Sequence, residues 1–214
     1  MTEKVTRGNG FLEGILAKKR TTMANSLIPD GLRLGRILDV GCGTSPYFLK
    51  NIEFQEKYGV DRISETSTDA LDNSGIVIKN FDLELGHRLP FDDNYFDVVA
   101  MLAVLEHLEA DTIERIIKEV RRVIKKGGVF IGTTPVWWAD SILRIMARLR
   151  LVSSEEIDEH KTFFTRDKLH DMISAGGFTE EITTGSFEGG VNLWFVVQKS
   201  INSLYPQKET IYSD

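Results

Sequence analysis

The chain has 214 residues, of which 42% are hydrophobic and 27% charged, as expected for one soluble globular domain with a sizeable core. Its formal net charge of −6 argues against a nucleic-acid-binding surface, and it contains no apolar run long enough to span a membrane. A single cysteine, Cys42, cannot form an internal disulfide, and the start of the chain lacks the hydrophobic core of a signal peptide. We therefore expect a cytoplasmic protein.

The predicted elements alternate along the chain between short apolar strands and helices. A basic amphipathic stretch within residues 1–30 is expected to form a helix that covers the functional site. A strand at 36–40 and a helix at 46–53 come next. Further strands are expected at 57–60, 76–80, 96–102 and 129–133.

The clearest helical pattern covers residues 110–128, where isoleucine and valine repeat at spacings of three and four. Asp111 with Glu114 three residues later resembles an N-terminal capping box, and the basic pair and glycine at 125–127 suit the other end. Alternation of such helices with continuously apolar strands indicates a parallel sheet covered on both faces. Ligands of such sheets bind beyond the carboxyl ends of the strands, where the strand order reverses.

Two glycines directly follow the first predicted strand, in the sequence ILDVGCGTSPYFLK. A dinucleotide-binding fingerprint would need a third glycine three residues after Gly43, but Pro46 occupies that position. No Gly-Lys-Ser/Thr follows either, which argues against a phosphate-binding P-loop. A nicotinamide-dependent dehydrogenase is therefore disfavoured, and the loop predicts a cofactor that contains adenosine but no phosphate.

Acidic residues end the second and third predicted strands. Asp61 lies 20 residues after Gly41, where a carboxylate can accept hydrogen bonds from both ribose hydroxyls. Asp82 could accept from an adenine amino group, with Phe81 and Leu83 flanking the ring. The alternative is that Asp39 and Asp61 only cap turns and the glycines only shape one. Their joint occurrence at the ends of successive strands favours a binding site.

Several segments resemble the class I S-adenosylmethionine-dependent methyltransferases, in the ubiquinone-biosynthesis-like branch of methyltransferase types 11 and 12. They are ILDVGCGTSP, YGVD, NFDLELGHRLPFDDNYFDVVAMLAVLEHL, VRRVIKKGGVFIGTTP and HKTFFTRDKLHDMISAGGF. The resemblance covers residues 30–198 approximately. The chain departs from many members at Ser45, which replaces a third glycine, and in a longer spacer, LELGH, after Asp82.

The resemblance implies an α/β fold with a Rossmann-like, doubly wound, seven-stranded sheet, mostly parallel with the last strand antiparallel. Residues 178–185 and 191–198 would supply the final pair of strands. A single domain over 1–200 would include an N-terminal helical cover and an acceptor-side insertion at 136–165. Residues 201–214 are expected to form a flexible tail.

The resemblance also implies S-adenosyl-L-methionine as the cofactor, and no metal. The expected cofactor-binding residues are Asp39, Gly41, Cys42, Gly43, Asp61, Arg62, Asp82, Leu83 and Ala103. The reaction would be an in-line displacement at the methyl carbon, for which the enzyme mainly has to hold the two reactants in line.

Two histidines are candidate catalytic residues, because a hydroxyl acceptor would need a general base. The resemblance places His107, in VLEHL, near the methyl group, and a neutral imidazole suits proton removal at physiological pH. The alternative is that His107 and Glu106 only close the loop. His160 is the second candidate, whereas His87 and His170 are expected on the surface.

The expected partner is a small-molecule methyl acceptor, lipid-linked, aromatic or a sugar, rather than a nucleic acid. The segment 137–152 could be an ordinary core helix, an acceptor lid or a membrane-surface helix, because Trp137, Trp138, Arg144 and Arg148 suit an interface. The alternative function is a catalytically inactive module that binds S-adenosylmethionine without turnover. The chain contains all of the acidic and glycine residues expected of the site, which favours an enzyme.

Overall fold

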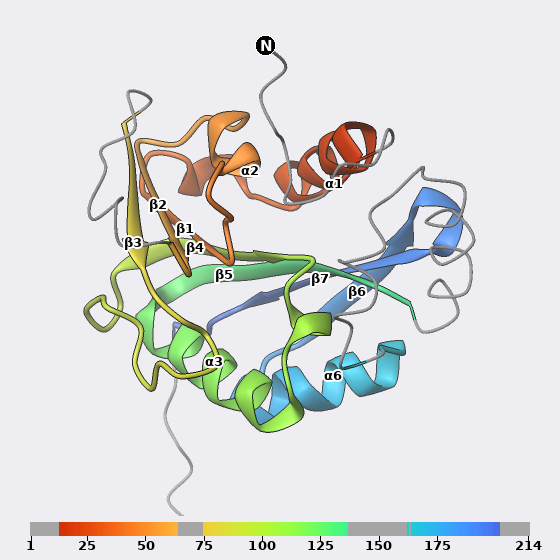
Figure 1. Cartoon of the computed structure of the whole chain (residues 1–214). Coiled ribbons are helices and arrows are strands. Elements are labelled where there is room, and N and C mark those ends of the chain that lie inside the picture. The colour runs from red at the N-terminus through yellow and green to blue at the C-terminus, as the bar shows by residue number, and fades with distance from the viewer. Residues whose placement is uncertain (1–12, 64–74, 137–161, 163, 202–214) are drawn as a thin grey trace, which may run out of the picture.

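A seven-stranded sheet forms the centre of the computed structural model, which describes residues 13–63, 75–136, 162 and 164–201 (Figure 1). The strands are β1 (Arg36–Val40), β2 (Glu56–Asp61), β3 (Ile76–Asn80), β4 (Phe96–Leu102), β5 (Ile124–Pro135), β6 (Ile182–Phe187) and β7 (Asn192–Gln198). The helices are α1 (Glu13–Ser26), α2 (Tyr47–Lys50), α3 (Ala110–Val123) and α6 (Arg166–Ala175). Short 3-10 turns are η1 (Asp30–Leu32), η3 (Leu105–His107) and η4 (Glu188–Gly190).

The strand order in the sheet is β3-β2-β1-β4-β5-β7-β6. Strands β1 to β5 pair in parallel, and β7 runs antiparallel to both β5 and β6. The chain builds outward from β1 to β3 and then crosses back to place β4 on the other side of β1. The strand order therefore reverses between β1 and β4, and the predicted fold class is confirmed.

Helices cover both faces of the sheet, with α1 and α2 on one face and α3 and α6 on the other (Figure 1). Alternate residues of β4 feed two separate apolar cores, because successive strand side chains point to opposite faces. Val99 and Met101 join the core beneath α3, whereas Val98 and Ala100 join the core beneath α1 and α2. Continuous apolar strands are thus explained by burial on both faces.

Three predicted helix boundaries are wrong. The helix expected at 46–53 ends at Lys50. The Lys57 ammonium donates hydrogen bonds to the carbonyls of Leu49 and Ile52, at 3.0 and 3.2 Å, in place of a further helical turn. The helix expected to reach 128 ends at Val123, since the next residue pairs with the start of β4 and opens β5. The residue before the helix is Glu109 rather than the expected Asp111, and its side chain makes no capping hydrogen bond.

The final pair of strands is confirmed, but β6 begins at Ile182 rather than at 178. Phe178 is fully buried and stacks on Phe130 with ring centroids 5.7 Å apart, so that residue serves the core before the strand starts. Phe130 and Phe178 belong to the apolar core on the side of the sheet that α3 and α6 cover.

The N-terminal helix α1 packs on its face of the sheet through small side chains. Its buried residues are Ala17, Thr21 and Ala24, which repeat at spacings of three and four along one side. Small residues allow the helix backbone to approach the sheet closely. The expectation that this helix covers the functional site stays a prediction.

The acceptor-side insertion leaves the described part of the chain after Val136 and returns at Thr162. The segment 137–152, with its lid and membrane-surface interpretations, lies outside the described residues, as does most of the expected tail at 201–214. Within the part of the chain that the structure describes, no helix combines the length and the apolar character needed to cross a bilayer.

Candidate functional site

Two loops meet where the strand order reverses, one after β1 and one after β4. Gly41 adopts a φ of +81°, and a Cβ atom at that position would lie 2.4 Å from Cγ2 of Val104. Only glycine allows both the left-handed backbone and this close approach. Gly43 adopts a φ of +72° but has open space around it, so its requirement is conformational only.

The glycine loop is fastened to the end of β2. The backbone N–H groups of Gly41 and Cys42 both donate to the carbonyl of Val60, at 2.8 and 3.2 Å. The next backbone N–H, of Gly43, donates to Oδ2 of Asp61 at 2.7 Å. The Asp61 carboxylate therefore fixes the loop, as the turn-capping alternative expected.

This structural role is compatible with ligand binding by the same carboxylate. Its Oδ1 accepts a hydrogen bond from the backbone N–H of Arg62 at 2.6 Å. A carboxylate offers about four acceptor positions in total, so one such group can serve both a loop and ribose hydroxyls. Asp61 is half-buried, which keeps it reachable from solvent.

Asp39 lies beneath the same loop and is only 4% exposed. Burial, and then the neighbouring Asp61, raise the pKa of the Asp39 carboxyl to about 8. No cation in the described residues offsets this effect on the pKa. A positively charged ligand at the carboxyl edge would favour the ionised form of Asp39.

Cys42 holds the glycine loop through its backbone N–H rather than its thiol. Its side chain is buried and packs against Gly59, where a Cβ atom would lie 2.6 Å from the sulfur. Burial raises the pKa of the Cys42 thiol far above its usual range, which makes the sulfur inert at neutral pH.

The loop after β3 begins with Asp82, the candidate acceptor for adenine. Its Oδ1 receives the backbone N–H groups of Glu84 and Leu85 at 2.8 and 3.2 Å, and its Oδ2 lies 3.7 Å from the exposed Arg62 guanidinium. Gly86 lies directly on the ring of Phe81, where a Cβ atom would be 2.3 Å away. Phe81 and Leu83 are both half-buried and both pack against the core beneath α3.

The loop after β4 contains a backbone strain that the sequence did not reveal. Ala103 adopts a φ of +56°, in the region that favours glycine, while its N–H donates to the carbonyl of Thr133 at 2.9 Å. Strain of this kind is concentrated at functional sites. Turn η3 follows at once and carries half-buried His107, the candidate base.

Glu106, beside that histidine, is 2% exposed and joins three parts of the chain. Its carboxylate accepts from the hydroxyl of Thr134 at 3.2 Å, and its backbone carbonyl accepts from the N–H of Thr162 at 3.1 Å. The Thr162 hydroxyl donates to the carbonyl of Leu108 at 2.9 Å. The return of the acceptor-side insertion is therefore fixed to the turn that carries His107.

The remaining histidine predictions have two outcomes. His87 and His170 are exposed, as expected. His160 lies outside the described residues, and Phe164, four residues later, is fully buried in the core beneath α3. In the described part of the chain, no group of three or more histidine, cysteine or acidic side chains is arranged to hold a metal.

Comparisons with known proteins agree with this geometry. A family model described as a methyltransferase domain matches residues 38–132, which run from β1 into β5. A malonyl-[acyl-carrier protein] O-methyltransferase of Geobacter sulfurreducens is 27% identical over 71% of this chain and 58% of its own length. A demethylmenaquinone methyltransferase of Staphylococcus carnosus is 28% identical over 84% of this chain and 79% of its own length.

The chain thus spans less than two thirds of the first of these two relatives. Curated relatives also include tRNA N(3)-methylcytidine methyltransferase of Drosophila melanogaster, 22% identical over 68% of this chain and 49% of its own length. Among solved structures, an S-adenosylmethionine-dependent methyltransferase from Thermotoga maritima, a possible histamine N-methyltransferase, superposes with a TM-score of 0.65. It is 21% identical, over 89% of this chain and 92% of that one, and shares the fold.

Proposed function

Because the chain belongs to the class I S-adenosylmethionine-dependent methyltransferases, we propose that it transfers a methyl group from S-adenosyl-L-methionine to a small-molecule acceptor. The product of the cofactor would be S-adenosylhomocysteine. The observation that carries the proposal is the glycine loop, which is bonded to Asp61, lies over Asp39 and contacts Val104 at the strand reversal. Ligands of open parallel sheets bind at that edge, where the strand order reverses.

Each part of the site has a proposed role toward the cofactor. Asp61 would accept from the ribose hydroxyls, and Asp82 with Leu83 would bind the adenine. The backbone of residues 41–43 would lie along the methionine part, and strained Ala103 would bound the methyl end. Arg62, which is 72% exposed at its side chain, would shield the ribose from outside.

When bound, the cofactor would supply a methyl group bonded to a positively charged sulfur, which would become neutral once the acceptor displaced it from the methyl carbon. The protein's own contribution is to hold the acceptor and the methyl carbon in line and to exclude water. For a hydroxyl acceptor, His107 would take the proton as the new bond forms.

The acceptor is proposed to be a small molecule, lipid-linked, aromatic or a sugar, rather than RNA. The named substrates of the relatives differ widely, since they include a carrier-bound malonyl group, a quinone precursor and tRNA. The net charge of −6 disfavours a polyanionic acceptor, because tRNA-binding surfaces are usually basic.

The direct test has two stages on the purified full chain. Calorimetry should show binding of S-adenosylmethionine and none of NAD, and Asp61→Ala should weaken the affinity by about 2 kcal/mol through lost hydrogen bonds to a charged acceptor. Asp92→Ala, in an exposed loop position, is the matched control and should leave the affinity unchanged.

Release of S-adenosylhomocysteine is then measured over a panel of quinone precursors, lipids, sugars, amines, carrier-bound acids and unmodified tRNA. Turnover with one of the small molecules supports the proposal. Turnover with tRNA alone would replace the acceptor class. Cofactor binding without turnover on any acceptor would instead favour an inactive binding module.

A further inference from the structure

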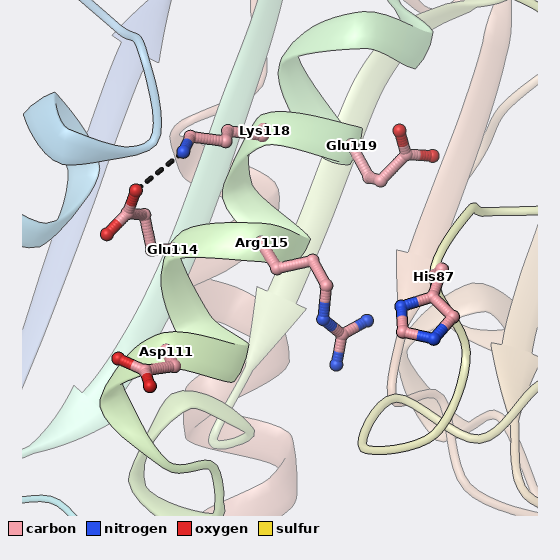
Figure 2. A pocket seen from close by; sticks show the side chains of 6 residues that line it. All are labelled: His87, Asp111, Glu114, Arg115, Lys118 and Glu119. Atoms are coloured by element: carbon pink, nitrogen blue, oxygen red, sulfur yellow. Dashed lines mark hydrogen bonds and ion pairs between the residues drawn. The ribbon is translucent and has the colours of Figure 1, made fainter.

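Three polar residues of α3 face the loop that connects β3 to β4. Arg115, Glu119 and Arg122 are spaced four and three residues apart, which places them on one side of the helix. Figure 2 shows Arg115 pointing from α3 toward the part of the loop that carries His87. The side chains of all three residues form hydrogen bonds with the backbone of the loop.

The first part of the loop is a single helical turn that Arg115 caps. The N–H of Gly86 donates to the carbonyl of Asp82 at 2.8 Å, and the turn continues no further. Three carbonyls of this segment accept from the Arg115 guanidinium, which donates to Leu83 at 2.9 Å, to Glu84 at 3.0 Å and to Gly86. Such carbonyls would otherwise need water or a following turn.

The second part of the loop is held by the other two residues of the stripe. The Leu89 N–H donates to Glu119 at 2.8 Å, and Arg122 donates to the carbonyls of Leu89 and Phe91 at 3.0 and 2.9 Å. Arg122 also pairs with Glu119 at 2.6 Å. The loop is therefore fixed at both ends, and Arg115 caps the turn that starts at Asp82.

The hollow beside Arg115 is not itself a ligand site. Its other lining residues are His87, Asp111, Glu114, Lys118 and Glu119, and none of them belongs to the glycine loop. Lys118 and Glu114 pair with each other at 2.5 Å (Figure 2). Arg115 is occupied by three carbonyls, so no cation in the hollow is left to attract an anion.

We propose that Arg115 is a positioning residue for adenine recognition, because it fixes the turn from which Asp82 and Leu83 approach the cofactor. The inference rests on the proposed function, in which these two residues bind the adenine. The spacer LELGH, directly after Asp82, is the segment that Arg115 caps. A planar guanidinium can serve three carbonyls at once, whereas a lysine ammonium has no such fork.

The consequence is a specific loss of selectivity. Without the cap, three carbonyls of the turn lose the guanidinium as a hydrogen-bond donor, and the turn can rearrange. The Asp82 oxygens then no longer keep one position. A carboxylate held in place prefers adenine, which donates from its amino group, over hypoxanthine, which has an oxygen there. A mobile carboxylate discriminates less between them.

The experiment compares the affinities of the full chain for S-adenosylhomocysteine and for its inosine counterpart. The wild-type protein should prefer the adenine form, and in Arg115→Ala the ratio of the two dissociation constants should fall by about tenfold, the value of one good hydrogen bond. Arg115→Lys should show a similar fall and provides a second variant if the alanine protein does not fold. Lys118→Ala, in the same hollow, is the matched control and should keep the wild-type ratio.

A purely structural role for Arg115 would lower the melting temperature while leaving the ratio unchanged, and that result would overturn the inference. Equal wild-type affinities for the two compounds would overturn it as well, because no adenine preference would then exist to be positioned. Failure of the wild-type protein to bind S-adenosylhomocysteine at all would contradict the proposed function instead. The two failures are therefore distinguishable.

Discussion

At the amino ends of the parallel strands the charged groups have hydrogen-bond partners, whereas at the carboxyl ends no cation of the described residues pairs with the buried acids. Asp97 accepts from the backbone N–H of Arg36 and from the Lys125 ammonium, both at 2.8 Å. Lys199 is 6% exposed and donates to three uncharged oxygens at 2.7 to 2.9 Å. At the other end, Asp39 is buried beside a second acid, and the Glu106 carboxylate accepts from the hydroxyl of Thr134.

The difference separates stability from function. A buried charged group whose hydrogen bonds are all made holds the elements around it in register. Removing that group leaves its buried partners without hydrogen bonds, which is costly. A buried acid without a cation makes the protein less stable by itself, and it becomes favourable only when a positive ligand arrives. Substitutions at the amino ends are therefore expected mainly to reduce stability. Substitutions at the carboxyl ends are expected mainly to reduce ligand binding and turnover.

The largest effect is expected from Gly41→Val at the carboxyl end. The side chain would overlap Val104 and strain a left-handed backbone, so affinity for S-adenosylmethionine should fall by about 10³-fold or more, where the backbone term alone is roughly 1–2 kcal/mol. Calorimetry measures the affinity. Gly189→Val is the matched control, because its φ is +70° and no atom lies within 4 Å of the added Cβ position. Equal losses in both variants would show that backbone strain, not contact at the site, is responsible.

The next effect concerns turnover. If the acceptor is a hydroxyl, His107→Ala should lower the turnover number by about 10²-fold, because a general base contributes that much. Cofactor affinity and melting temperature should change little, since His107 is half-buried at the end of a short turn. His170→Ala, on an exposed helix surface, is the control. Full activity of the His107 variant would remove that residue from the chemistry.

The amino end should respond in the opposite way. Lys199→Met removes the donor to Asn94 and to the carbonyls of Arg121 and Ile124, which should reduce the free energy of unfolding by about 2 kcal/mol. Urea unfolding measures this loss, and exposed Lys126→Met is the control. Affinity for S-adenosylmethionine should stay the same. A large loss of affinity in Lys199→Met would mean that the two ends are not separable.

The smallest effect is a pH dependence that Asp39 should impose on stability without ligand. Its pKa is about 8 in the folded chain against an ordinary 3.8, so the folded form holds a proton that the unfolded form has released. Stability must therefore fall as the pH rises between these values. The asparagine in Asp39→Asn does not titrate. The free energy of unfolding of this variant, relative to that of the wild type, should therefore rise by about 1 kcal/mol between pH 7 and pH 8.

Urea unfolding at pH 7 and pH 8 measures the difference in free energy of unfolding between Asp39→Asn and the wild type. Asp92→Asn, at an exposed position, is the control. An advantage that is the same at pH 7 and pH 8 would contradict a raised pKa for Asp39. Addition of S-adenosylmethionine should shrink the advantage, because a cationic ligand favours the ionised carboxylate that asparagine lacks.

The sequence by itself determined several of the strands and the family motifs, and it predicted the location of the site. The strands at 36–40, 76–80 and 96–102 have the predicted bounds, because short apolar runs between turn-forming residues specify a buried strand locally. The motifs also led to the family, the cofactor and the fold class. Glycines after the first strand and acids after the next two are local patterns, and strand direction alone brings them to one edge.

Only the tertiary structure decided which of these residues serve one another. The contact of Gly41 with Val104, the bond from Gly43 to Asp61 and the cap that Arg115 places on the Asp82 turn all join residues far apart in sequence. The end of α3 was likewise set by strand pairing at Ile124, against a helical pattern that continued. Such contacts depend on register and packing between elements, and no local pattern of residue types encodes those distances.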